Sequence, residues 1–286
     1  VDEGEAASIK SIRFVGNHIM SDDDLSEQMS LTPSGWMTWY TKGDLYSREK
    51  LAADIESIRS YYLNSGYLDF KVDSVQVSIA PNKQDIFITI NVTEGSQYRI
   101  SGVELTGDML GLQSELESLI EIEKDSIYNA EVINNASTAM VDKLTTLGYA
   151  FATARPTPVV TGLNEAKIVY TIDPGRRAYV RRVNISGNSK TQDEVIRREV
   201  RQYEASWFDS DSVKLSRDRI DRLGFFDSVT VEPKPVPGTR DQVDLEVVVK
   251  ERPTGSVSLG AGYSTSDGVI LSGGFSQNNI FGTGKA

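Results

Sequence analysis

Residues 180–188 read VRRVNISGN, and altered copies of this stretch occur twice earlier, as KSIRFVGN at 10–17 and RISGVELTGD at 99–108. Each copy alternates apolar and polar residues, which is the period of a half-buried β-strand. Each then ends in Gly-Asn or Gly-Asp, residues that tolerate left-handed backbone angles and so redirect the chain. The stretch therefore predicts a strand followed by a tight turn, repeated at domain-sized intervals.

A similar succession of elements follows each copy. A short helix comes first, then a longer amphipathic helix, then two more alternating strands. In the first long helix, Leu51, Ile55, Ile58 and Tyr62 recur on one apolar face. The short helices are expected to begin at hydroxyl and carboxylate pairs with capping-box spacing. These pairs are Ser21 with Asp24, Ser114 with Glu117, and Thr191 with Glu194.

The repeated order is β-α-α-β-β, which predicts an α+β fold because two amphipathic helices must cover one face of a three-stranded sheet. The modules join almost without linkers. We expect them at 8–94, 95–175 and 176–252, with a hairpin segment at 253–286. Residues 1–4 (VDEG) resemble the ending of a module, so we expect residues 1–7 to be the tail of a preceding copy in a longer tandem array.

The pattern changes after Pro253. Two runs of alternating residues follow, from 255 to 263 and from 269 to 275, with a polar turn between them. Alternation over about 9–11 residues with an aromatic residue near one end is typical of a transmembrane β-barrel hairpin. A soluble Gly-rich hairpin fits the same pattern, and the residues alone leave both interpretations open.

Composition excludes several kinds of site. The chain of 286 residues contains no Cys, which excludes disulfides, thiolate metal sites and cysteine nucleophiles. The net charge of −11 argues against nucleic acid as the main partner. The charge is uneven, since residues 1–175 hold 13 basic and 26 acidic residues while 176–252 hold 16 and 14. This difference suggests that the third module has a different partner.

No motif in the sequence indicates catalysis. The single histidine, His18, follows the first Gly-Asn turn and lacks the second His or Cys of a typical zinc site. Gly260, Gly262 and Gly268 do not form a phosphate-binding motif, since no Gly-Lys-Ser/Thr follows them. We therefore predict that the chain is not an enzyme and has no catalytic, cofactor-binding or metal-binding residues.

The tandem modules and the hairpin resemble the POTRA domains and first barrel strands of the Omp85 superfamily, in the branch that assembles outer-membrane proteins. The resemblance covers the whole chain and is strongest in 176–286. It is carried by AYVRRVNISGN (178–188), VIRREVRQYEASW (195–207), RLGFF (222–226), VPGTRDQVDLEV (236–247), VKERPTGS (249–256), GYSTSDG (262–268) and NNIFGTG (278–284).

The resemblance implies three-stranded mixed sheets and numbers the modules third, fourth and fifth of the family's five. It also implies a Gram-negative outer-membrane protein with its modules in the periplasm and a barrel in outer-membrane lipid. The implied partners are unfolded outer-membrane protein clients and lipoproteins of the BamB and BamD types. An edge strand would bind clients or a partner through its backbone.

Three groups of residues match positions with a role in the family. A BamB-type partner or a client would contact the expected edge strand 72–79 of the first module. A BamD-type partner would dock on the expected helix 195–203, where Glu199 would accept a hydrogen bond from a partner arginine or pair within its own helix. The first barrel strand would form one side of a lateral gate. The residues for the BamB-type partner or client are Leu31, Val75, Gln76 and Val77. Those for the BamD-type partner are Arg197, Arg198, Glu199 and Arg201. Those of the lateral-gate strand are Gly255, Val257, Leu259, Ala261 and Tyr263.

Two alternative functions remain open from the sequence. The chain could belong to a related transporter of the TamA or two-partner secretion type. It could instead be a passive periplasmic spacer that sets the distance between a barrel and its partners. Binding of unfolded outer-membrane substrate peptides would separate the assembly function from the spacer.

Overall fold

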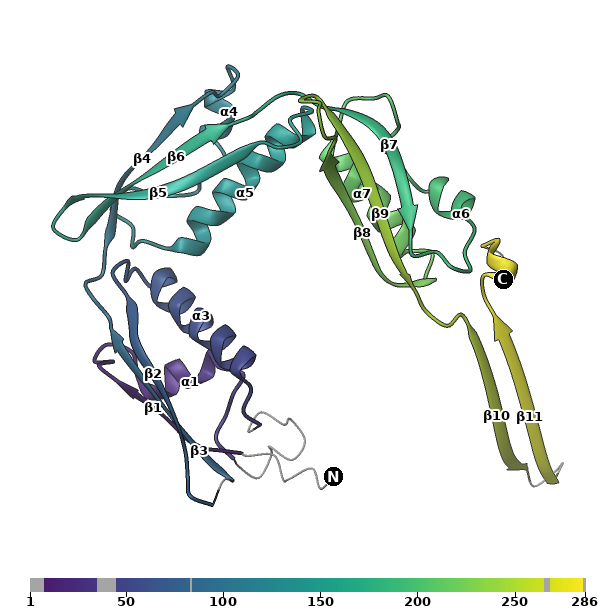
Figure 1. Cartoon of the computed structure of the whole chain (residues 1–286), viewed down its shortest axis with the longest axis horizontal. Coiled ribbons are helices and arrows are strands. Elements are labelled where there is room, and N and C mark those ends of the chain that lie inside the picture. Colours follow the sequence, from purple (N-terminus) through teal and green to yellow (C-terminus); the bar gives the residue numbers. More distant parts are fainter. Residues whose placement is uncertain (1–7, 35–44, 83, 265–267, 285–286) are drawn as a thin grey trace. The chain divides into compact units, whose positions relative to one another are not determined.

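The computed structural model describes residues 8–34, 45–82, 84–264 and 268–284. These residues form three modules, each with a three-stranded sheet and helices on one face, followed by a two-stranded hairpin (Figure 1). The predicted α+β class and the β-α-α-β-β order are thereby confirmed. The chain divides into two compact units, and their boundary passes through the middle module.

The helices and strands follow the predicted order in every module. The first module comprises β1 (Ser8–Val15), α1 (Asp22–Glu27), α3 (Arg48–Asn64), β2 (Lys71–Ile79) and β3 (Asp85–Thr93). The middle module comprises β4 (Arg99–Gly107), α4 (Gln113–Glu117), α5 (Ala130–Thr146), β5 (Thr153–Gly162) and β6 (Glu165–Asp173). The third comprises β7 (Tyr179–Ser186), α6 (Asp193–Arg197), α7 (Ser210–Asp221), β8 (Phe226–Pro235) and β9 (Gln242–Glu251). The hairpin consists of β10 (Gly255–Ser264) and β11 (Gly268–Gln277), and a 3-10 turn (Ile280–Gly282) follows it.

Each sheet places the last strand of its module in the centre. The strand orders are β1-β3-β2, β4-β6-β5 and β7-β9-β8. In the first and third modules the first strand runs parallel to the central strand and the second runs antiparallel to it, so these sheets are mixed as predicted. The first and second strands of every module are therefore edge strands.

The core of each module lies between the central strand and the helices. In β9, Val243, Leu245, Val247 and Val249 are all buried, while the residues between them are less covered. The period-2 alternation of the sequence therefore corresponds to one face packed against the helices. The equivalent buried residues are Ile86, Ile88, Ile90 and Val92 in β3, and Ala166, Ile168, Tyr170 and Ile172 in β6.

The glycines that end the first strands are needed because the turn passes very close to the central strand. Gly187 has φ +86°, and a Cβ atom there would lie 1.9 Å from the carbonyl oxygen of Val249. Gly16 has φ +95°, and its Cβ would lie 2.2 Å from the carbonyl oxygen of Val92. No side chain fits at these distances, and the positive φ also favours glycine.

One of the three predicted capping pairs forms. Ser21 and Asp24 make the reciprocal bonds of a capping box at the start of α1. The pair Ser114 and Glu117 is a wrong prediction, because α4 begins earlier and Ser114 lies inside it. The pair Thr191 and Glu194 is also wrong, because Gln192 precedes α6 and the Thr191 side chain bonds elsewhere.

Candidate interaction sites

The backbone of β2 presents hydrogen-bonding groups at the edge of the first sheet. Ala80 donates its amide to the carbonyl of Asp85 at 2.9 Å, which marks a hydrogen-bonded antiparallel pair. Bonded and non-bonded pairs alternate along such strands. The register places Val75 and Val77 at non-bonded positions opposite Ile90 and Ile88. The N–H and C=O groups of Val75 and Val77 therefore point away from β3.

The side chains of these two valines remain accessible. Val75 and Val77 share a sheet face with Ile90 and Ile88, which are buried beneath the helices. Nevertheless, Val75 is 38% exposed and Val77 is 37% exposed. Gln76 is exposed as well, and alternation directs it to the opposite face. The edge thus combines outward backbone groups with uncovered apolar side chains.

The corresponding edge strands of the other modules carry prolines. Pro156 and Pro158 lie in β5, and Pro233 and Pro235 lie in β8. Proline lacks an N–H group and is one of the residues that protect sheet edges from pairing with other chains. No proline occurs in β2 (KVDSVQVSI). Of these three strands, β2 is the one suited to accept an added strand.

Leu31 does not belong to this surface. Its side chain is only 1% exposed and packs in the core of the first module. Its backbone amide donates to the carboxylate of Asp54 at 3.0 Å. We therefore withdraw Leu31 as a contact residue, because a partner could not reach it without opening the core. The prediction rested on the match to a family position, whereas here the side chain packs in the core.

The predicted docking helix of the third module is shorter than expected. It was predicted over 195–203, but α6 spans Asp193–Arg197, and Arg198 is its C-cap. The next amides bond three residues back rather than four, as Glu199 does to the carbonyl of Ile196 at 2.9 Å. The buried hydroxyl of Ser216 accepts the amide of Arg201 at 2.8 Å. This contact from α7 diverts the chain out of the helix.

The four predicted docking residues lie together on this turn. Glu199 is largely covered, with 17% of its side chain exposed. It accepts hydrogen bonds from Arg219 of α7, with N–O distances of 3.0 and 2.8 Å, and lies 3.7 Å from the Arg198 guanidinium. Glu199 thus pairs with its sequence neighbour Arg198, as the alternative of a local pair expected, and also with Arg219 from another helix. Sequence reasoning missed Arg219.

The remaining arginines of the turn have different surroundings. Arg197 bonds to Asp193 at 2.9 Å and lies 3.7 Å from Glu204. It also donates to the backbone carbonyl of Val183 at 3.3 Å. Arg201 donates to the carbonyl of Arg198 at 3.0 Å. About half of the Arg197 and Arg198 side chains remains exposed. The turn therefore presents cationic groups around a carboxylate that is already paired.

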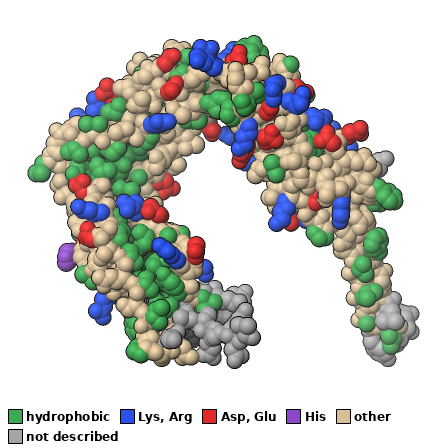
Figure 2. All heavy atoms as spheres, viewed as in Figure 1, with side chains coloured by type: hydrophobic (Ala, Val, Ile, Leu, Met, Phe, Trp, Pro, Cys, Tyr) green, Lys and Arg blue, Asp and Glu red, His purple; other side chains and the backbone are tan. Residues whose placement is uncertain are grey.

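The hairpin has one apolar face and one small, polar face. Pairing of β10 with β11 places Val257 opposite Phe275 and Ala261 opposite Leu271. The other face consists mainly of Ser and Gly, including Ser258 opposite Gly274. Val257, Leu259 and Phe275 are 72–88% exposed. Figure 2 shows hydrophobic side chains along the hairpin. Gly255 and Tyr263 lie near the two ends of β10.

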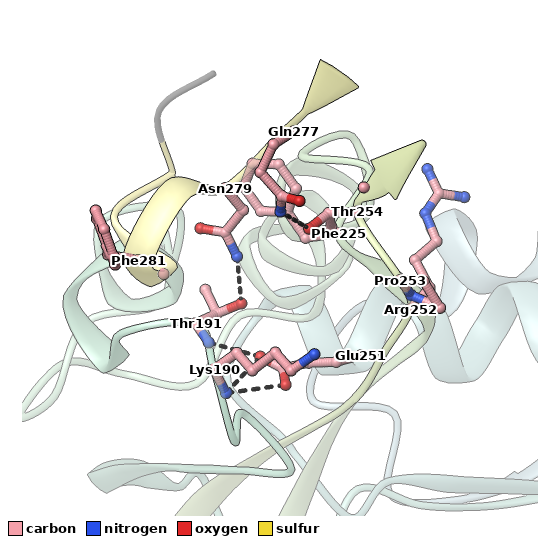
Figure 3. Close-up of a pocket in the computed structure, with 12 residues that line it drawn as sticks. Lys190, Thr191, Phe225, Glu251, Arg252, Pro253, Thr254, Gln277, Asn279 and Phe281 are labelled. Carbon is pink, nitrogen blue, oxygen red and sulfur yellow. Dashed lines mark hydrogen bonds between the residues drawn. The ribbon is translucent and has the colours of Figure 1, made fainter. Parts of the chain in front are cut away.

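A pocket of about 490 Å³ lies where the third module meets the hairpin (Figure 3). On one side of it, Glu251 accepts the Ser189 hydroxyl at 2.7 Å and the amides of Lys190 and Thr191 at 2.9 and 2.6 Å. Burial alone would raise the pKa of Glu251, but these hydrogen bonds more than offset it and lower the pKa to about 2. The carboxylate ties the Gly-Asn turn to the end of β9.

The first module contains the same carboxylate arrangement. Glu94 accepts the backbone amides of His18, Ile19 and Met20 at 2.7–3.2 Å and the Tyr62 hydroxyl at 2.7 Å. Burial opposes ionisation, but the Tyr62 hydroxyl and these amides hold the pKa of Glu94 below its usual value. The His18 side chain is exposed, and the residue stabilises the turn through its backbone amide, which donates to Glu94.

The segment after β11 folds back onto the turn of the third module. The Asn279 side-chain amide donates to the Thr191 hydroxyl at 2.8 Å, and both residues are buried (Figure 3). The carbonyl of Gly282 accepts the amide of Gln192 at 2.9 Å. A Cβ atom on Gly282 would lie 1.9 Å from the carbonyl oxygen of Lys190. These contacts explain why Thr191 does not cap α6.

In the ranges that the structure describes, no group of three or more His, Cys, Asp or Glu side chains is placed to hold a metal ion. No described helix is both long enough and apolar enough to cross a membrane.

Comparison with known protein families finds the same three modules. The POTRA family, described as surface antigen variable number repeat, matches residues 7–95, 98–175 and 178–252. The outer membrane protein assembly factor BamA of Neisseria meningitidis serogroup B is 36% identical over the whole chain, and BamA of Buchnera aphidicola is 30% identical. The chain covers 36% of the first protein and 46% of the second, so it spans less than half of these relatives.

Two solved BamA structures also match this chain. The crystal structure of Haemophilus influenzae BamA POTRA3-5 matches with a TM-score of 0.77 and 33% identity. That match covers 86% of this chain and 96% of the other. BamA of Haemophilus ducreyi lacking POTRA domains 1–3 matches with a TM-score of 0.56 and 32% identity, over 65% of this chain and 36% of that one.

Proposed function

The chain belongs to the POTRA family, and from this premise we propose that it is the membrane-proximal periplasmic part of an outer-membrane protein assembly factor. Its modules would be the third to fifth POTRA domains of a Gram-negative outer-membrane protein. The match to the Haemophilus influenzae POTRA3-5 structure supports this numbering. The role is that of a non-enzymatic scaffold, which recruits lipoproteins and receives unfolded β-barrel clients.

The observation that carries this proposal is the open β2 edge. A strand from another chain can bond to the outward N–H and C=O groups of Val75 and Val77, while its side chains contact the exposed valines. Such pairing uses main-chain groups and makes little demand on sequence. It therefore suits a scaffold that handles many clients rich in alternating strands. A loop of a BamB-type lipoprotein could occupy the same edge.

Val77→Pro is expected to abolish pairing at this edge while the first module stays folded. The N–H group of Val77 points outward, so its loss breaks no bond between β2 and β3. Binding should weaken at least about tenfold, since an N–H donor is lost and the proline ring obstructs the added strand. The measurement is the affinity of the chain for a BamB-type lipoprotein by calorimetry.

Val77→Thr is the matched control, because threonine keeps the N–H group and the branched shape. Circular dichroism would verify that both variants are folded. If the proline variant binds as tightly as the parent chain, strand addition at β2 is excluded as the mode of binding.

The turn after α6 is the second proposed partner site. A BamD-type lipoprotein would dock on Arg197, Arg198, Glu199 and Arg201. The Arg219 contact refines this proposal, because the Glu199 carboxylate already has a guanidinium partner within the module. A partner arginine would therefore replace or join Arg219. Charge-assisted hydrogen bonds between a guanidinium group and a carboxylate are stronger than neutral hydrogen bonds.

Glu199→Lys is expected to weaken binding of the BamD-type partner at least about tenfold, because it puts a third cation between Arg198 and Arg219 and repels the partner arginine. Arg219→Gln is the informative companion. If partner and Arg219 compete for the carboxylate, this variant should bind equally well or more tightly. A pull-down titration would measure both. Equal loss in the two variants would instead assign Glu199 a purely structural role.

The hairpin completes the proposal. β10, with Gly255, Val257, Leu259, Ala261 and Tyr263, would be the first strand of a barrel in outer-membrane lipid and one side of its lateral gate. Its exposed apolar face supports a lipid-facing role. Its glycines weaken it as a strand, which would favour opening toward a client strand.

A passive spacer remains the alternative to an active scaffold. Both need folded modules, but a spacer needs no open edge. Binding of unfolded outer-membrane substrate peptides to the intact chain separates the two. Saturable binding that Val77→Pro weakens would support the scaffold, and absence of binding would favour the spacer.

A further inference from the structure

The middle and third modules make the same backbone hydrogen bonds next to their first strands, at positions that differ by 80. Ile100 donates to the carbonyl of Ser126 and accepts from Asp125. Eighty residues later, Val180 donates to the carbonyl of Ser206 and accepts from Ala205. Position 103 in β4 is therefore equivalent to position 183 in β7. Both strands lie at the edge of their sheets.

In the third module, two side chains bond to the outward backbone groups of the edge strand β7. Glu204 accepts the amide of Val183 at 2.7 Å, and Arg197 donates to the carbonyl of Val183 at 3.3 Å. Arg197 and Glu204 also lie 3.7 Å from each other. Together they supply the acceptor and the donor that an added strand would otherwise provide.

The middle module has the opposite charges at the equivalent positions. Glu117 replaces the arginine, and Lys124 replaces the glutamate. A carboxylate cannot donate to the carbonyl of Val103, and an ammonium group cannot accept its amide. Within the described residues, no side chain bonds to the backbone of Val103 as Arg197 and Glu204 do to Val183. An outward donor and acceptor therefore remain available.

The surface beside β4 is shaped for an extended chain. A groove of about 420 Å³ lies between β4, the end of α4 and residues 120–124. Val103 and Leu105 line one side of it, and Ile120 and Ile122 line the other. All four are half-buried, so they form an apolar floor that is still accessible. Glu117 stands at the rim, where it accepts a hydrogen bond from Gln113.

We propose that this groove binds an extended polypeptide segment of alternating apolar and small residues, as a strand added to β4. The outward N–H and C=O of Val103 require a partner with both groups, which a peptide backbone supplies. Alternation would direct every second side chain to the apolar floor. The Glu117 carboxylate at the rim can pair with a Lys or Arg at the end of such a segment, and Lys124 lines the groove as well. β10 itself has such alternation (GSVSLGAGYS).

This inference rests on the proposed function, since barrel clients are rich in such strands, but it adds a site separate from the β2 edge. The test titrates the intact chain with a peptide of the 255–264 sequence carrying a terminal lysine. Amide NMR shifts locate the binding. A scrambled peptide with the same lysine tests whether alternation matters. Shifts are expected at 103–105 and 120–124 with the alternating peptide.

The decisive variant is the double exchange Glu117→Arg with Lys124→Glu. This exchange gives the middle module the same side chains that bond to the backbone of Val183 in the third module, and it leaves the net charge unchanged. Peptide affinity at the groove should fall at least about tenfold, as one lost backbone pairing would predict. The matched control, Glu56→Arg with Arg59→Glu, inverts an exposed pair in α3 and should leave affinity unchanged. The reverse exchange, Arg197→Glu with Glu204→Lys, should produce new shifts at Val183.

The positions of the shifts decide between the inference and the proposed function. Shifts confined to the β2 edge, or groove binding that the Glu117 and Lys124 exchange leaves unchanged, would overturn this inference and leave the proposed function standing. Shifts at neither place would count against both. Equal shifts with the scrambled peptide would overturn the inference as well, because attraction to the lysine alone would explain them.

Discussion

Gly187→Ala is expected to lower the free energy of unfolding of the third module by about 3–4 kcal/mol, among the largest effects of a single added methyl group. Two causes add. A non-glycine residue at φ +86° is strained by about 1–2 kcal/mol. The new Cβ would also lie 1.9 Å from the Val249 carbonyl oxygen, so the turn or the central strand must shift. Hydrogen exchange of the β9 amides in the intact chain measures the loss.

Gly238→Ala separates these two causes. Gly238 has φ +82°, but a Cβ atom there would meet nothing within 4 Å. This variant should therefore show only the conformational part, about 1–2 kcal/mol. Equal losses at positions 187 and 238 would contradict the view that close approach to β9 requires the glycine. Gly16→Ala should behave like Gly187→Ala in the first module, since its Cβ would lie 2.2 Å from the Val92 carbonyl.

Glu251→Gln is expected to destabilise the third module by about 2 kcal/mol at pH 7, after allowance for partial exposure to solvent. The folded-state pKa of Glu251 is about 2, below the usual 4.5. Ionisation therefore stabilises the fold fully above about pH 4.5, and this stabilisation is lost as the pH falls through about 2. The difference between parent and variant should shrink accordingly. Chemical denaturation at a series of pH values measures it, with the fluorescence of Trp207 as probe in a background where Trp36 and Trp39 are replaced by Phe.

Glu232→Gln provides the matched control for that series. Glu232 lies in β8 and pairs with Lys234 at 3.0 Å, with both side chains more than half exposed. Its replacement should change stability by less than about 0.5 kcal/mol at any pH. A penalty for Glu251→Gln that stays constant from pH 7 to pH 2 would mean that the lost contacts do not depend on ionisation.

The carboxylate that ties turn to strand is absent from the middle module. Glu94 and Glu251 each follow the last buried residue of the central strand by two positions, after Val92 and Val249. The equivalent position after Ile172 is Pro174, which has no carboxylate. There Asp108 accepts the amide of Leu110 at 2.9 Å instead. This difference is visible in the sequence once the end of the central strand is known.

The predictions that succeeded used information local to each segment. Alternation in 243–249 and helical spacing in 51–62 identified the central strand and the long helix, because burial of one face sets the residue pattern directly. The Gly-Asn turns were found because these residues tolerate the left-handed backbone angles that the turns require. The fold class and the edge position of β2 followed from the order of these elements and from the family resemblance.

The predictions that failed concerned side chains with more than one available role. Leu31 was expected at a partner surface and lies in the core, since an apolar residue suits either place. Thr191 has the spacing of a helix cap, but Glu251 and Asn279 bind it from 60 and 88 residues away. The Ser216 hydroxyl accepts the Arg201 amide and so ends the docking helix early.

Strands, helices and turns could thus be located from the order of residues alone, because each depends on neighbours within a few positions. Three features came only from the folded chain: the pairing of Glu199 with Arg219, the closure of Val183 by Arg197 and Glu204, and the opening of the equivalent groove at Val103. Hydrogen bonds act over about 3 Å whatever the separation in sequence, so partners remote in the chain could be identified only after folding had brought them together.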